Sequence, residues 1–130
     1  MHFITQRLIM GYRSNITAVF YTSKEKWPVL KQYVDEHFPE EFKEDLTVQG
    51  ERAYIFKLDN AKWYDSYPEV HAFERFVSNF LEFAKGVDDS TQWAYEFVRI
   101  GENSDDVEET HSNGAEYDVL SIIRNVEVCI

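Results

Sequence analysis

The chain has 130 residues, of which 16% are aromatic, and a formal net charge of −11 at neutral pH. This length and aromatic content indicate one folded domain with its own core, and a lone cysteine, Cys129, excludes a disulfide within the chain. The negative charge disfavours direct binding to nucleic acid or anionic membranes. No long apolar run predicts a membrane helix and residues 1–10 do not form a secretory signal, so we expect a cytoplasmic protein.

The acidic residues are distributed unevenly. Residues 87–130 hold eleven acidic and two basic residues, whereas residues 1–86 hold thirteen acidic and eleven basic residues. This asymmetry favours an acidic surface that faces a partner over a charge that only keeps the protein soluble.

The first half of the chain shows a strand, a helix and a hairpin. Residues 16–21 are rich in β-branched and aromatic residues and predict a strand. A helix is expected within residues 24–38, because apolar residues recur there at helical spacing. Thr22 and Glu25 have capping-box spacing, but Pro28 favours a start nearer Trp27, and Pro39 ends the helix. Strands at 46–48 and 52–58 flank a predicted turn at 49–51.

The second half continues with a helix and two strands. A capping-box pair of Ser66 and Glu69, with Pro68 in the first turn, predicts a helix that runs to Lys85 and is closed by Gly86. Residues 91–100 alternate in character and predict a strand, residues 101–116 predict an acidic loop, and residues 117–130 predict a last strand. The order β-α-β-β-α-β-β indicates an α+β fold, with an antiparallel-rich sheet and both helices packed on one face.

Motifs for metal binding and catalysis are weak. The four histidines do not pair at metal-site spacings, and the five glycines form no phosphate-binding loop. His71 and Glu74 share a helix face and could form a general-base pair, although a solvent-facing helix start is the favoured interpretation. We therefore predict no catalytic residues, no metal and no cofactor.

Two other features are candidate binding sites. The acidic segment around Asp105, Asp106, Glu108 and Glu109 lacks the EF-hand pattern, which disfavours a divalent-cation site. It is otherwise a solvated loop or a recognition surface. No lysine or arginine lies between Arg99 and Arg124, and a loop that only aids solubility usually mixes charges, so a recognition surface stays a candidate beside the solvated loop. The predicted partner-binding residues are Glu102, Asp105, Asp106, Glu108, Glu109, Glu116 and Asp118. The second candidate is a polar-aromatic cluster that holds a small ligand, anchors an interface or simply packs over a helix start. It consists of Trp63, Tyr64, Tyr67 and His71.

Four short segments resemble small acidic proteins of tailed bacteriophages. They are Met-Gly-Tyr-Arg-Ser at 10–14, Lys-Trp-Tyr-Asp at 62–65, Phe-Val-Arg-Ile-Gly-Glu at 97–102 and Asp-Asp-Val-Glu-Glu at 105–109. Members of that family start at the Met of the first segment, so the resemblance implies that residues 1–9 are an N-terminal extension and 10–130 the domain. The family has no settled activity, and small acidic phage proteins often bind host machinery or imitate nucleic acid.

Three functional hypotheses follow. The favoured one is a non-enzymatic acidic protein that engages a basic host protein, plausibly one that binds nucleic acid, as an inhibitor or nucleic-acid mimic in the bacterial cytoplasm. The alternative is a small-molecule or nucleotide-binding domain, possibly an enzyme, whose site uses Trp63, Tyr64, His71, Glu74 and Arg99. It requires that these side chains converge on a concave pocket. The third is an oligomeric accessory protein, such as a homodimer, in which the strand at 117–130 pairs across subunits.

Overall fold

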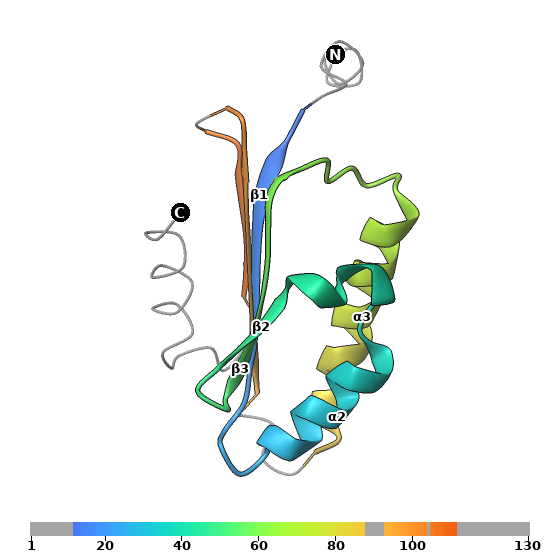
Figure 1. Cartoon of the computed structure of the whole chain (residues 1–130), viewed down its shortest axis with the longest axis vertical. Coiled ribbons are helices and arrows are strands. Elements are labelled where there is room, and N and C mark those ends of the chain that lie inside the picture. The colour runs from blue at the N-terminus through green and yellow to red at the C-terminus, as the bar shows by residue number, and fades with distance from the viewer. Residues whose placement is uncertain (1–11, 88–92, 104, 112–130) are drawn as a thin grey trace.

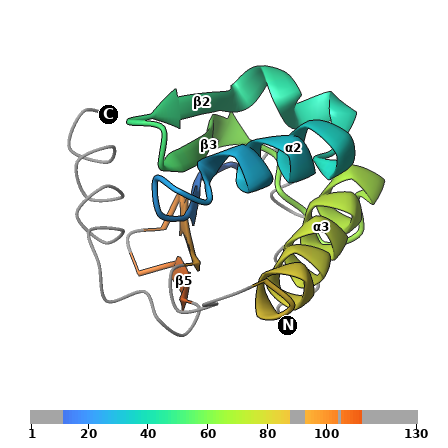
Figure 2. The same cartoon turned by 90° about the horizontal axis from the view of Figure 1, so that it is seen from below.

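The protein is an antiparallel sheet covered on one face by helices (Figures 1 and 2). The computed structural model describes residues 12–87, 93–103 and 105–111. Within them the strand order is β2-β3-β1-β4-β5, and both α-helices lie on the same side of the sheet. The predicted α+β class is confirmed. No helix among the described residues is both long and apolar enough to cross a membrane.

Strand β1 (Ser14–Tyr21) is central in the sheet. It pairs antiparallel with β3 (Ala53–Ala61) on one side and with β4 (Ala94–Gly101) on the other. A strand with neighbours on both edges has all its backbone groups paired, and its β-branched and aromatic side chains fill both faces. Seven of its eight residues are accordingly buried.

Helix α2 (Trp27–His37) begins where Pro28 favours it and ends before Pro39, as predicted. It buries Leu30 and Val34 against the sheet. A 3-10 helix, η1 (Glu40–Asp45), follows and was not expected from its mainly charged sequence. Its one buried residue, Phe42, explains its position, because the short turn places that ring on the core beside Phe56.

Helix α3 (Pro68–Lys85) buries one apolar stripe and ends at Gly86, as predicted. The predicted capping pair of Ser66 and Glu69 is wrong. The N-cap residue is Tyr67, and no side chain caps it. Pro68 accounts for the difference, because it occupies the first turn, needs no N–H partner there and already has a helical φ angle.

The hairpin between β2 (Leu46–Gln49) and β3 is confirmed, with its turn at residues 50–52. Gly50 and Glu51 have φ angles of 65° and 54°, and the N–H of Arg52 donates to the carbonyl of Gln49 at 3.2 Å. Two successive positive φ angles match the right-handed twist of the flanking strands.

The interpretation of residues 101–116 as a loop is wrong in part, because strand β5 (Val107–His111) lies within it. It pairs with β4, so that Arg99 lies opposite Glu108 and Val98 opposite Glu109. An exposed edge strand tolerates acidic residues, and Arg99 compensates one of them. The strand predicted at 117–130 lies outside the described residues.

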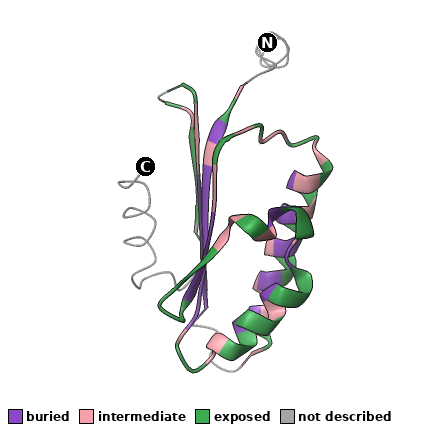
Figure 3. Cartoon of the chain, viewed as in Figure 1, coloured by how far each residue is buried: buried purple, intermediate pink, exposed green. Residues whose placement is uncertain are grey.

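Buried side chains form an apolar cluster on each face of the sheet. In Figure 3 the buried residues lie along the central strands and on the helices that cover the sheet. On the helical face, the fully buried Phe20 ring lies within 5.2–6.3 Å, centroid to centroid, of five other aromatic rings. A smaller cluster, with Val19, Ile55 and Val98, occupies the other face. The predicted alternation of β4 is confirmed, because Tyr95 and Phe97 belong to the first cluster and Ala94 and Val98 to the second.

Candidate functional site

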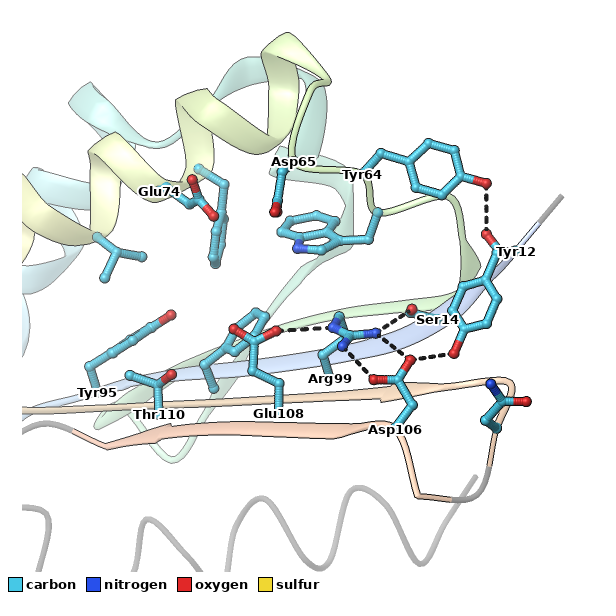
Figure 4. A pocket seen from close by; sticks show the side chains of 15 residues that line it. Tyr12, Ser14, Tyr64, Asp65, Glu74, Tyr95, Arg99, Asp106, Glu108 and Thr110 are labelled. Atoms are coloured by element: carbon cyan, nitrogen blue, oxygen red, sulfur yellow. Dashed lines mark hydrogen bonds and ion pairs between the residues drawn. The ribbon is translucent and has the colours of Figure 1, made fainter. Parts of the chain in front are cut away.

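A cavity of about 480 Å³ lies between α3 and the β4–β5 end of the sheet (Figure 4). Five segments line it: the start of β1, the loop at 63–65, residues 73–77 of α3, alternate residues of β4, and the turn and strand at 103–110. The volume falls within the range of small-molecule sites. We call it the pocket.

Arg99 lies at the centre of the pocket floor. Its Nη2 donates to Oδ1 of Asp106 at 2.8 Å and its Nη1 to Oδ2 at 3.2 Å, which makes a bidentate ion pair. Its Nε donates to Oε1 of Glu108 at 3.0 Å, and Nη1 also donates to Oγ of the buried Ser14 at 3.1 Å. A guanidinium held in this way has one orientation, so it is a fixed part of the site.

The turn between β4 and β5 positions Asp106. The N–H of Gly101 donates to the carbonyl of Asp106 at 2.8 Å, and the hydroxyl of Tyr12 donates to its carboxylate. A Cβ at Gly101 would collide with the Tyr12 hydroxyl and the Asp106 carboxylate. The missing side chain of Gly101 therefore allows a close approach of three chain segments.

A β-bulge shapes the other side of the pocket. Ile16 pairs with Leu58 but Ser14 pairs with Ala61, so β3 carries one extra residue. Within the bulge Asn60 has a φ angle of 60°, and its N–H donates to Oδ1 of Asn15 at 2.8 Å. Such a bulge bends the strand. Here it lies immediately before the loop that carries Trp63, Tyr64 and Asp65 to the pocket.

The loop at 63–65 joins the core to the pocket. The half-buried ring of Trp63 lies 5.4 Å from that of Phe73 and 6.4 Å from that of Phe97, centroid to centroid. The hydroxyl of Tyr64 donates to the carbonyl of Tyr12 at 3.2 Å. Trp63 therefore packs on α3, as one interpretation of the cluster expected, and it also lines the pocket. A ligand role for the cluster stays a prediction.

Two further carboxylates face the pocket from the side opposite Arg99. Asp65 from the loop and Glu74 from α3 point toward it, whereas Tyr95 and Glu108 point up from the sheet (Figure 4). Neither Asp65 nor Glu74 accepts a hydrogen bond or forms an ion pair with the chain as far as it is described. With Asp106 and Glu108, four carboxylates line the pocket against one guanidinium.

The network shifts the proton affinities of its members. The hydrogen bonds to Asp106, followed by the one to Glu108, raise the pKa of Arg99 despite its partial burial. Burial, and then the hydrogen bond to Asp106, raises the pKa of Tyr12. Burial also raises the pKa of Tyr95, with smaller contributions from the charges of Glu108 and Glu74.

Most, but not all, residues of the predicted ligand site line the pocket. Trp63, Tyr64, Glu74 and Arg99 converge on the pocket, as that hypothesis requires. His71 does not line it and is exposed on α3. Tyr67 lies beside the pocket, with its ring 5.0 Å from that of Tyr64, centroid to centroid.

The predicted partner-binding residues fall into three groups: those bound to Arg99, those that are exposed, and those outside the described residues. Asp106 and Glu108 are bound to Arg99. Glu102, Asp105 and Glu109 are exposed, and Oε2 of Glu102 accepts a hydrogen bond from the backbone N–H of Arg13 at 2.7 Å. Glu116 and Asp118 lie outside the described residues.

Several pocket residues were not predicted as site residues. Tyr12 and Ser14 were named only as part of the segment at 10–14, and Tyr95 and Phe97 only as part of the strand predicted at 91–100. One feature of the sequence could have identified part of the site. Alternate residues along 93–97 are aromatic and face the core, and the next residue in this series is Arg99, so a charged side chain follows the apolar ones on the same face.

The pocket gathers the four segments that carry the resemblance described above. They contribute Tyr12 and Ser14; Trp63, Tyr64 and Asp65; Phe97 and Arg99; and Asp106 and Glu108. Comparisons of the chain with protein-family models, with curated proteins and with solved structures gave no match.

Proposed function

We propose that this chain is a binding protein and that the pocket is its ligand site. The observation that carries this proposal is the convergence of polar side chains from distant segments on one cavity with aromatic walls. A cavity of this kind, with a few oriented polar groups, is the usual form of a small-molecule site. That the protein binds without catalysing a reaction remains a prediction.

A pocket-filling substitution tests this proposal. Val77 lines the pocket from α3, so Val77→Trp places an indole in the cavity, whereas Val48→Trp puts the same residue on β2, where Val48 is 53% exposed. We expect fragments that bind the wild type in an NMR screen to bind Val48→Trp and not Val77→Trp. The absence of wild-type hits, or hits that Val77→Trp leaves unchanged, would refute the pocket as a binding site.

Binding to a basic host protein remains a second candidate, supported by the exposure of Asp105 and Glu109. Neutralising Asp106 or Glu108 is not a clean test, because both hold Arg99. The sharper variant is Asp105→Asn with Glu109→Gln, in a pull-down from bacterial lysate at moderate salt. The control, Glu40→Gln with Glu44→Gln in η1, makes the same change in net charge. A partner captured equally by both double variants would argue against this surface.

The oligomeric hypothesis can be tested separately. The strand proposed to pair across subunits, at residues 117–130, lies outside the described residues. Light scattering on the full chain distinguishes a homodimer from a monomer, and a monomer at high concentration would contradict that hypothesis.

A further inference from the structure

The N–H donors of Arg99, the guanidinium at the pocket floor, are nearly all in use. Nε of Arg99 donates to Glu108, and Nη2 donates to Asp106. Nη1 donates to Ser14 and to Asp106. Four of the five guanidinium N–H groups are therefore occupied. An anionic ligand, including a nucleotide phosphate, would have to displace carboxylates from Arg99 to gain the bidentate contact that makes arginine an anion site.

By contrast, three carboxylates of the pocket have oxygens that accept no hydrogen bond from the described part of the chain. Asp65 and Glu74 have no hydrogen-bond or ion-pair partner from the described part of the chain, and the contacts of Glu108 there involve only Oε1. These oxygens come from the loop, from α3 and from β5, so they surround the space between α3 and the sheet. A ligand that complements them brings N–H donors and positive charge.

The walls indicate that such a cation is organic. Trp63, Tyr64 and Tyr95 are among the aromatic residues of the lining, and aromatic faces attract both cations and flat apolar groups. No three His, Cys, Asp or Glu side chains are grouped to hold a metal ion in the described ranges of the chain. The carboxylates are thus suited to the extended N–H pattern of an amidine, a guanidine or an amine.

We propose that the pocket takes a small organic cation with an aromatic or apolar body, whose amidine, guanidine or amine group is received by Glu74 with Asp65 and Glu108. This inference rests on the proposed function and specifies the ligand class of the same site. A cation is preferred over a nucleotide as the ligand, because the residues that line the pocket carry a formal net charge of −3.

Three probes of nearly identical shape test the charge. Benzamidine is a cation, benzamide is neutral and benzoate is an anion, so their binding to the full chain, followed by NMR chemical shifts and calorimetry, isolates the effect of charge. We expect benzamidine to bind about tenfold more tightly than benzamide and benzoate to bind least. The chemical shifts that change should belong to residues 63–65, 74 and 95–110.

Substitution of Glu74 supplies the matched control. We expect Glu74→Gln to weaken benzamidine binding roughly fivefold and to leave benzamide binding unchanged. Glu82→Gln removes the same charge from α3 outside the pocket, where Glu82 pairs with Lys85, and should leave both affinities unchanged.

The outcomes separate this inference from the proposed function. Equal binding of the three probes in the pocket, or tighter binding of benzoate, overturns the cationic ligand and keeps the pocket as a binding site. Shifts confined to other regions, or no binding of benzamidine, also overturn the inference. The proposed function is decided independently by the fragment screen on Val77→Trp.

Discussion

Arg99 on β4 and Asp106, the residue before β5, form a bidentate ion pair, and Arg99 also joins the β4–β5 turn to Ser14 at the start of β1. The pair is largely shielded from water, with side chains 18% and 32% exposed. Loss of the guanidinium would leave two carboxylates, those of Asp106 and Glu108, without their charged partner. The site and the local stability of the sheet edge therefore depend on the same residue.

Arg99→Met should lower the free energy of unfolding by about 2 kcal/mol, because it removes charge-assisted hydrogen bonds from a half-buried network. Lys31→Met is the matched control, since Lys31 pairs with Asp35 at 3.4 Å on the exposed face of α2. We expect its effect to stay within about 0.5 kcal/mol. Urea denaturation of both variants measures the difference, and equal effects would show that the Arg99 network contributes no more than a surface pair.

Gly101→Ala should destabilise the protein by about 1–3 kcal/mol, because its Cβ would collide with the Tyr12 hydroxyl and the Asp106 carboxylate. Gly86→Ala is the control. Its Cβ would meet only the Phe83 carbonyl at 3.6 Å, an ordinary contact, so we expect a neutral or slightly stabilising effect. Thermal unfolding gives the order of the two variants. A Gly101→Ala protein as stable as Gly86→Ala would rule out the close approach of Tyr12 and Asp106.

Tyr95→Phe should make the protein more resistant to alkali. Burial, with the charges of Glu108 and Glu74, raises the pKa of Tyr95 in the folded state. The stability that this provides is fully present below the unfolded pKa of about 10 and is lost as pH rises toward the folded pKa. In Tyr95→Phe the midpoint of alkaline unfolding, followed by circular dichroism and phenolate absorbance, should move to higher pH.

The alkaline transition should not disappear in that variant, because burial also raises the pKa of Tyr33 and Tyr54. The control is Tyr67→Phe, at the N-cap of α3 and partly exposed. If Tyr95→Phe and Tyr67→Phe unfold at the same pH as the wild type, ionisation of Tyr95 does not limit stability.

Phe20→Ala should cost about 3–5 kcal/mol of the free energy of unfolding, since it opens a cavity beneath rings from α3, from the sheet and from Phe38, which follows α2. Val48→Ala, at a position that is 53% exposed, should change this free energy by less than about 0.5 kcal/mol. Guanidinium denaturation measures both. A small effect of Phe20→Ala would mean that the core repacks around the missing ring.

The local sequence determined most of the secondary structure. Helix α3, the end of α2 before Pro39, the hairpin turn at Gly50 and the two faces of β4 were all predicted, because each depends on spacing or on backbone preferences within a few residues. From the same patterns, the α+β class and the placement of both helices on one face followed, since each apolar face needs a partner layer.

Sequence patterns named several candidate residues, but only the tertiary structure brings Trp63, Glu74 and Arg99 together in one pocket. Strand β5 has the sequence Val-Glu-Glu-Thr-His, without an apolar alternation, so it becomes a strand through pairing with β4. The register of that pairing places Glu108 opposite Arg99, and the turn brings Asp106 to the same guanidinium. Trp63 and Glu74 join them because the bulge at Asn60 and the packing of α3 bring distant segments together. Periodicity shows which face of an element is buried, whereas contacts between elements depend on how the elements pair and pack.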